Sequence, residues 1–436
     1  MKPSTGSRGW ILMGAGLLLL IGSGTRHANL VNMRKTEHLQ EVAPEDTTPL
    51  VAITTVAFGG FRGLVADALW VRANKMQEEG QFFELVQLAR WITQLEPRVP
   101  EVWSFQAWNL AYNISVLFPE FEDRWRWVNH GIDLLRKEGL THNPNSATLH
   151  WDIGWMFQHK IGMEFDTAHW LYKQKLNQQI EELLPDGHLP ESDVSAEVGR
   201  QLADRFSMRA GDMRELDAEY GPLDWRMPDT HTLYWSTRGL PLARDTHRER
   251  MLRRMRMQSL GALMRRGRTL TDPESRAMVF LPRFDLVSPV LEEYQTFLAA
   301  RPSNQYLQQG YENVLRDAML LHAEYGQVDE AFGYYPLLAG ENADLPEARE
   351  TFQAFVQQEL TREPGELSQD QAMTRVVALI RRSRTEPDPV RARGYLQMAR
   401  QIHQLYQQSR VDQGHFQRTG LPEFEVMVRL LKSENG

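Results

Sequence analysis

The chain has 436 residues, of which 42% are hydrophobic and 24% are charged, as is ordinary for a folded protein with one long or several shorter domains. Its formal net charge of −8 argues against nucleic acid as the main partner, because phosphate binding needs a basic field. The absence of cysteine excludes disulfides, thiolate metal sites, cysteine nucleophiles and the lipidated cysteine of a bacterial lipoprotein.

The N-terminal segment is predicted to reach a membrane. Lys2 and Arg8 precede an uncharged apolar run, residues 10–24. This run makes about 22 Å of helix, which is shorter than a hydrocarbon core of about 30 Å. Three interpretations stay open: an uncleaved anchor lengthened by residues 28–33, a signal peptide cleaved near residues 22–24, or a helix buried in the fold. In the first two cases the body is exported. We therefore expect a single-pass membrane protein with its body on the extracytoplasmic (periplasmic) side, or a secreted form after cleavage.

A polar tether is predicted next. Residues 34–50 are polar and end in turn-forming residues. The β-branched run 50–58 then precedes a glycine cluster, residues 59–63, and a helix. This order is that of a dinucleotide-binding turn, but Phe58 stands where the G-x-G-x-x-G fingerprint needs glycine. Two other interpretations stay open: close backbone packing against the following helix, or contact of residues 50–71 with the membrane surface.

A spacing of 34 residues relates two predicted helical hairpins. Leu69, Ala73 and Met76 recur as Trp103, Ala107 and Leu110, and Gly80 lies 17 residues before Pro97. A small residue where two helices cross, a glycine turn and a proline stop are typical of tetratricopeptide (TPR) hairpins. The first hairpin is therefore predicted as helices 64–79 and 82–95, and the second begins at Pro100, a favoured first helical position.

The later elements depart from this period. Gly154 follows Ala107 by 47 positions, so the second hairpin is predicted to be enlarged and a third unit to begin at Ser146. Residues 192–219 are predicted as one polar helix and residues 244–268 as an arginine-rich helix. The other predicted elements are a hairpin starting at Pro228, a short extended piece at 280–287, a helical pair at 346–361 and 367–383, and end helices at 390–410 and 421–432.

Over residues 50–240 the chain resembles the TPR superfamily and, more closely, a family of membrane-anchored repeat proteins from bacterial genomes. The resemblance is carried by the hairpin residues above and by segments 59–73, 84–118, 123–132, 154–162 and 220–235. It implies fold and anchoring, and no catalytic residue. We expect an all-α fold, a TPR-like α-solenoid of antiparallel helix hairpins behind an N-terminal transmembrane or signal-anchor helix. The expected domains are 1–33 (anchor or signal segment), 34–50 (tether), 51–184 (TPR-like repeats), 185–288 (irregular helical insert with the arginine-rich helix) and 289–436 (C-terminal repeats and cap).

Two groups of residues are candidates for binding. Trp108, Asn109, Tyr112 and Asn113 follow the small crossing residue of the second hairpin, where repeat arrays line their concave side. Packing in the core is the alternative for these four, because buried aromatic side chains hold such arrays together.

The second group lies on the arginine-rich helix. Its candidates are Arg248, Arg253, Arg254 and Arg256, which could form a basic face for anionic lipid, a polyanionic envelope polymer or an acidic partner protein. The alternative is a solvated face neutralised by the acidic segments 191–218 or 341–350.

No catalytic, cofactor or metal site is predicted. His150, His159 and His169 stand 9 and 10 residues apart, which matches no common metal spacing, and neither G-x-S-x-G nor a phosphate-binding loop occurs. We therefore predict a non-enzyme: a membrane-anchored scaffold for other envelope or membrane proteins, with no cofactor. The alternatives are a glycan hydrolase or lyase on a helical scaffold, and a peripheral membrane-surface protein that uses the arginine-rich helix.

Overall fold

The computed structural model describes residues 62–192, 194–244, 246–301, 303–341, 351–411 and 420–433. The chain divides after Leu64, and the described residues from Val65 onward belong to one unit. Helices make up nearly all of its regular structure, which confirms the predicted all-α class. The predicted N-terminal segment and the tether lie outside the described residues. In the ranges given above, no helix is both long and apolar enough to cross a membrane.

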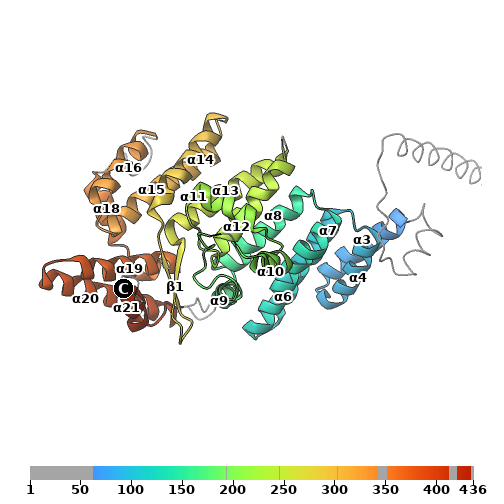
Figure 1. The fold of residues 1–436 in the computed structure, drawn as a ribbon, viewed down its shortest axis with the longest axis horizontal. Helices are drawn as coiled ribbons and strands as arrows, with labels where there is room; N and C mark the ends of the chain where they lie inside the picture. Colours follow the sequence, from blue (N-terminus) through green and yellow to red (C-terminus); the bar gives the residue numbers. More distant parts are fainter. Residues whose placement is uncertain are drawn as a thin grey trace, which may run out of the picture. The chain divides into compact units, whose positions relative to one another are not determined.

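The elements are labelled in chain order in Figure 1. The first are α3 (Arg62–Glu78), α4 (Phe82–Leu95), α5 (Pro100–Trp108), α6 (Phe121–Asp133), α7 (Leu140–His142), α8 (Ala147–Trp155), α9 (His169–Glu181), α10 (Ala196–Phe206), α11 (Ala210–Tyr220), α12 (Pro228–Gly239) and α13 (His247–Arg266). After the sheet come α14 (Val287–Ala299), α15 (Gln305–Glu324), α16 (Val328–Glu341), α18 (Phe352–Leu360), α19 (Gln369–Thr385), α20 (Pro389–Val411) and α21 (Phe424–Ser433).

Short segments complete this order. Three π-helical segments continue α5, α6 and α8, namely η1 (Asn109–Ile114), η3 (Leu134–Gly139) and η4 (Met156–Gly162). The 3-10 turns are η2 (Ser115–Leu117), η5 (Leu240–Leu242), η6 (Phe284–Leu286) and η7 (Pro364–Glu366). Strands β1 (Arg268–Thr271) and β2 (Met278–Leu281) pair antiparallel, with Arg268 opposite Leu281. Strand β2 covers the start of the predicted extended piece, which then turns into η6 and α14.

The first hairpin forms as predicted. Helices α3 and α4 meet at Gly80, whose φ of 72° lies in the left-handed region that glycine adopts without strain. Pro100 stands in the first turn of α5. The crossing residue Ala73 is fully buried, in a small apolar cluster that also holds Leu85 and Ile92.

Small residues let the next helices approach closely. At Gly131 of α6, a Cβ atom would lie 2.8 Å from the carbonyl oxygen of Ala107, so α5 and α6 cross at the predicted small residue. Gly154 of α8 is packed in the same way, because a Cβ there would lie 2.7 Å from the Met255 sulfur. Gly239 of α12 faces the Cβ of His150 at 2.9 Å. A larger side chain at Gly131 or Gly239 would push two helices apart, whereas at Gly154 the Met255 side chain would have to move.

The prediction of one helix over residues 192–219 is wrong. Helix α10 ends at Phe206, Ser207 takes a left-handed φ of 54°, and α11 begins at Ala210. Phe206 and Met208 are both buried in the main core. Two residues along a straight helix point about 200° apart, so both could not face one core without a break.

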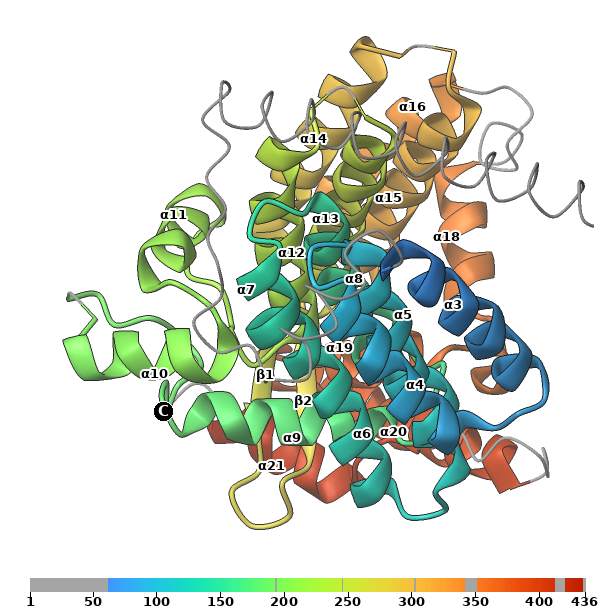
Figure 2. The same cartoon turned by 90° about the vertical axis from the view of Figure 1, so that its right-hand side faces the viewer.

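The main apolar core runs from Trp103 to Leu431 and includes contacts between elements far apart in the sequence. Asn177 of α9 donates to Thr271 of β1 at 3.1 Å, and α21 contacts the same strand. Figure 2 shows β1 and β2 beside α9 and α21. The backbone N–H of Gln369 donates to Glu164 over a separation of 205 residues. Packing is therefore not limited to sequence neighbours, as it would be in a strictly linear array.

Candidate functional site

Four helices that follow one another in space carry the candidate surface. Helix α5 contacts α8, α8 contacts α13, and α13 contacts α15. Figure 1 shows α8, α13 and α15 in this order across the unit. On α8 and its π-helical continuation, Trp151, Trp155 and His159 are spaced by four residues, which places them on one face of the helix.

Five half-buried rings on these helices form what we call the aromatic ladder: Trp108, Tyr112, His159, Trp155 and Trp151. The pair Trp108–Tyr112 is stacked with ring centroids 4.6 Å apart, and Tyr112 meets His159 at 5.8 Å. His159 then stacks on Trp155 at 4.8 Å, and Trp155 stacks on Trp151 at 5.3 Å. The ladder thus joins α5 and η1 to α8 and η4.

Further side chains contact the rings of the ladder. Arg248 of α13 covers Trp151 at 4.9 Å from the ring centroid, and the exposed Phe165 lies 4.5 Å from His159. Because most rings stack on a neighbour, their faces are largely occupied. The ladder therefore presents a wall of stacked, half-buried rings.

The four residues predicted on the second hairpin separate into two pairs. Trp108 and Tyr112 belong to the ladder. Asn109 is buried and donates to the carbonyl oxygen of Phe82 at 3.3 Å, and Asn113 donates to the Asn109 side chain at 3.0 Å. The two asparagines therefore join η1 to α4, while the aromatic pair faces the accessible side. The π-helical turns of η1 and η4 beside the ladder belong to a rare class that often marks functional sites.

Asp152 is buried behind the ladder and connects its two helices. It accepts hydrogen bonds from Ser104 and, at 3.3 Å, from the Trp108 indole N–H. Burial raises the pKa of Asp152 to about 6, although these two hydrogen bonds and the charge of Arg248 lower it. The carboxyl thus holds Trp108 in place.

A groove of 930 Å³ lies beside the ladder, near Phe165, the neighbour of its middle ring His159, and we call it the basic groove. It lies between α13, α14 and α15, and Met163 and Glu164, next to the ladder neighbour Phe165, line its near end. Arg250 and Arg254 are exposed cations on its α13 wall. Neither forms an ion pair with any residue that the structure describes. Arg250 donates to the His247 ring at 3.1 Å.

The carboxylates that line the basic groove are already engaged. Asp229 and Asp370 both bind Arg266, Asp317 binds Arg265 at 2.6 Å, and Glu164 accepts the Gln369 backbone N–H at 3.0 Å. Among the described residues, the charges without an ion-pair partner are therefore positive on the α13 wall, at Arg250 and Arg254, and negative at Glu164 at the near end of the groove.

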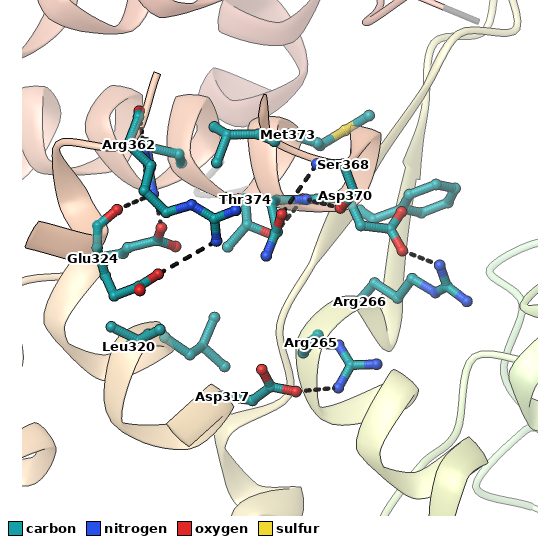
Figure 3. A pocket seen from close by; sticks show the side chains of 16 residues that line it. Arg265, Arg266, Asp317, Leu320, Glu324, Arg362, Ser368, Asp370, Met373 and Thr374 are labelled. Atoms are coloured by element: carbon teal, nitrogen blue, oxygen red, sulfur yellow. Dashed lines mark hydrogen bonds and ion pairs between the residues drawn. The ribbon is translucent and has the colours of Figure 1, made fainter. Parts of the chain in front are cut away.

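A second cavity of 370 Å³ shares Arg265, Arg266, Asp317 and Asp370 with the basic groove (Figure 3). Its other carboxylates are also paired: Glu324 with Arg375 at 3.3 Å and Glu359 with Arg362 at 3.4 Å. Burial raises the pKa of Glu324 to about 7, and Arg375 opposes that rise. The ion pairs join α13, α15 and α19, and Arg375 ties the end of α18 to α19 by donating to the backbone carbonyl oxygens of Glu359 and Arg362, so the second cavity is held by structural contacts.

The four arginines predicted as a basic face on α13 separate into residues held by neighbouring side chains and one residue that lines the basic groove. Arg256 is held by Glu219 at 2.7 Å and Glu293 at 2.6 Å. Arg253 pairs with Glu249 at 2.8 Å, and Arg248 lies on Trp151. Arg253 and Arg256 are therefore neutralised, as the alternative interpretation expected. Their acidic partners, Glu249, Glu219 and Glu293, lie outside the expected segment 191–218, and the side chains of segment 341–350 lie outside the described part of the chain. Arg254 alone of the four lines the basic groove.

Sequence reasoning missed three residues of this surface. Arg250 lies one turn before Arg254, and the repeated four-residue spacing of arginines on one helix could have indicated it. Phe165 and Tyr306 are 64% and 83% exposed. They lie outside the aromatic-rich helix pattern, so no periodic signal pointed to them.

Among the residues that the structure places, no group of histidine and acidic side chains is arranged to hold a metal ion. Comparison of the chain with protein-family models and with curated proteins gives no match.

Proposed function

We propose that this protein is a non-catalytic, TPR-like scaffold of a bacterial cell envelope, anchored by its N-terminal segment, and that it binds other envelope or membrane proteins. The aromatic ladder and the basic groove are the binding surface. The observation that carries the proposal is their continuity: residues 163–165 join a wall of half-buried rings to a groove of 930 Å³. Extended aromatic and arginine surfaces of this kind are typical of protein-binding sites.

The engagement of the acidic groups supports a binder over an enzyme. A glycosidase needs two carboxyl groups that face the same bond. The carboxylates of both cavities are bound to arginines or to a backbone N–H. The stacked faces of the ladder also leave few open ring surfaces on which a sugar could lie.

The glycan-acting enzyme remains the second candidate because of one observation. Asp152 has a pKa of about 6, as a general acid requires, and Glu101 on the neighbouring helix is close enough to raise that pKa. In this alternative Asp152 would protonate the leaving group and Glu101 would act as the second carboxylate. Glu101→Gln separates the two functions, because it abolishes glycan turnover in an enzyme and leaves partner binding intact in a scaffold.

The proposal is tested by crosslinking in membranes. A photoreactive amino acid replaces Phe165 in the full-length protein, and captured proteins are identified after illumination. We expect a discrete partner that is lost when Trp155→Ala is added. The matched control carries the photoreactive group at Phe121, which is also exposed but lies at the start of α6. Equal capture from both positions, or capture unaffected by Trp155→Ala, would contradict the proposal.

A further inference from the structure

Arg250 and Arg254 form a like-charge pair on one face of α13. At a spacing of four residues their Cα atoms are about 6 Å apart along the helix axis, and like charges at this spacing destabilise a helix. In the described part of the chain neither has a carboxylate partner, whereas Arg253, one position before Arg254, is paired with Glu249. Two uncompensated guanidinium groups on a groove wall indicate a site for two negative charges.

The surroundings show what kind of molecule could bring these charges. The walls also carry the half-buried Met251, the buried Met257 and Phe297, and the exposed Tyr306, and the small residues Gly261 and Ala262 leave room beside α13. Methionine side chains adapt to ligands of different shape. A ligand of this groove therefore combines carboxylates with apolar side chains, as a peptide does.

We propose that the basic groove binds an extended acidic segment of a partner protein, with two carboxylates at alternate positions (acidic-x-acidic) that meet Arg250 and Arg254. In an extended chain, residues i and i+2 point to the same side and lie about 6.6 Å apart. This spacing matches the two arginines, so both carboxylates reach a guanidinium without bending the peptide. The residues that flank the acidic pair contact Met251 and Tyr306, the accessible apolar side chains of the walls.

The groove beside the exposed arginines favours a peptide over a membrane surface. A bilayer is flat and is bound by side chains that protrude. Arg250 and Arg254 line a hollow between α13 and α15, beside Tyr294, whose raised pKa Arg254 opposes. An extended chain can enter such a hollow, and planar guanidinium groups bind carboxylates with two hydrogen bonds.

This inference rests on the proposed binding function and specifies the partner's chemistry. Its test uses the full-length protein in neutral detergent and a fluorescein-labelled peptide, SLETELSG, with binding followed by fluorescence anisotropy. Two comparison peptides change one property each: SLQTQLSG removes the charges, and SLEETLSG moves them to adjacent positions. We expect each to bind at least tenfold more weakly than SLETELSG.

The protein variants test the same contacts from the other side. The affinity of Arg250→Glu/Arg254→Glu for SLETELSG is expected to fall at least tenfold, and its affinity for SLKTKLSG is expected to rise. The gain for SLKTKLSG would show that the variant is folded. Arg391→Glu/Arg393→Glu, an equally large charge change at two exposed positions of α20, is expected to leave binding unchanged.

Three results would overturn the inference. The first is equal binding of SLETELSG and SLQTQLSG, and the second is no binding of SLETELSG at millimolar concentration. The third is displacement of the bound peptide by vesicles containing 30% phosphatidylglycerol, which would assign the arginines to a membrane. If a partner is still captured at Phe165 when this test fails, the inference is wrong and the proposed function stands. If the peptide binds and no partner is captured at Phe165, the assignment of the groove to acidic peptides stands and the proposed scaffold function is wrong.

Discussion

Asp152 links the chemistry of the binding surface to its geometry. It is the buried acceptor for Ser104 and Trp108, and so ties α5 to α8 behind the aromatic ladder. A carboxylate in this position stabilises the arrangement of the rings and is itself costly to ionise. The same residue therefore orients the surface and makes its stability depend on pH.

Replacing Asp152 tests this cost. Its pKa rises from 3.8 to about 6 on folding, so the folded state binds the proton more tightly and stability falls as pH rises from about 4 to about 6. Asp152→Asn should remove up to about 3 kcal/mol of this fall. Urea unfolding between pH 4 and pH 7 measures it, with the exposed Asp204→Asn as control. An unchanged pH profile would show that Asp152 is not buried as described.

Gly131 is the residue at which the second hairpin is most sensitive to volume. Gly131→Ala would place a methyl group 2.8 Å from the Ala107 carbonyl oxygen, and we expect a loss of about 1–3 kcal/mol in the free energy of unfolding. Gly199→Ala is the matched control, since Gly199 lies within α10 with open space around it. There alanine should stabilise the helix by about 0.5–1 kcal/mol. Thermal unfolding that ranks the two variants the other way would contradict the crossing.

At the scale of single elements, α13 combines two kinds of arginine. Arg256 is largely buried between Glu219 and Glu293, whereas Arg254 is exposed on the groove wall. Removing Arg256 would leave the carboxylates of Glu219 and Glu293 without a counter-charge. One helix thus serves as a packing element on one side and as a binding wall on the other.

This division predicts that two neighbouring substitutions affect different properties, one the stability and the other the binding of the peptide. Arg256→Ala should lower the free energy of unfolding by about 1–2 kcal/mol, because the largely buried Arg256 loses its packing and its bonds to the partly exposed Glu219 and Glu293. Arg254→Ala should change it by less than about 0.5 kcal/mol and should weaken binding of SLETELSG. Chemical denaturation and anisotropy measure both properties. Similar stability losses for the two variants would show that Arg254 is structural.

Elements with local signals could be predicted from the sequence. Gly80, Pro100 and the buried stripe of α4 indicated the first hairpin, because turn residues and helical periodicity act within a few positions. The break at Ser207 could not be predicted, since it depends on where Phe206 and Met208 meet the core.

The candidate site was likewise predictable only where its signals are local. Trp108 and Tyr112 stood at positions that repeat helices expose, and both belong to the ladder. The burial of Asn109 and the partners of Arg256 come from α4, α11 and α14, and contacts between distant segments leave no local pattern. Whether the array is TPR-like throughout stays a prediction.

At the scale of the whole unit, the binding surface depends on ties between distant parts of the chain. Arg266 binds Asp229 of α12 and Asp370 of α19, and Glu164 accepts from Gln369 at the start of α19. These contacts fix α13 between the first helices and the C-terminal ones. The ladder and the basic groove therefore form one surface although their residues extend from Trp108 to Val314 and beyond.

The most direct test is to map where a bound partner lies. The full-length protein is crosslinked in membranes, and the crosslinked residues are identified by mass spectrometry. We predict crosslinks concentrated around Phe165 and Tyr306, on either side of α13, and their loss in the Arg250→Glu/Arg254→Glu protein. Crosslinks concentrated on α10 and α20, unchanged by that double substitution, would contradict the account.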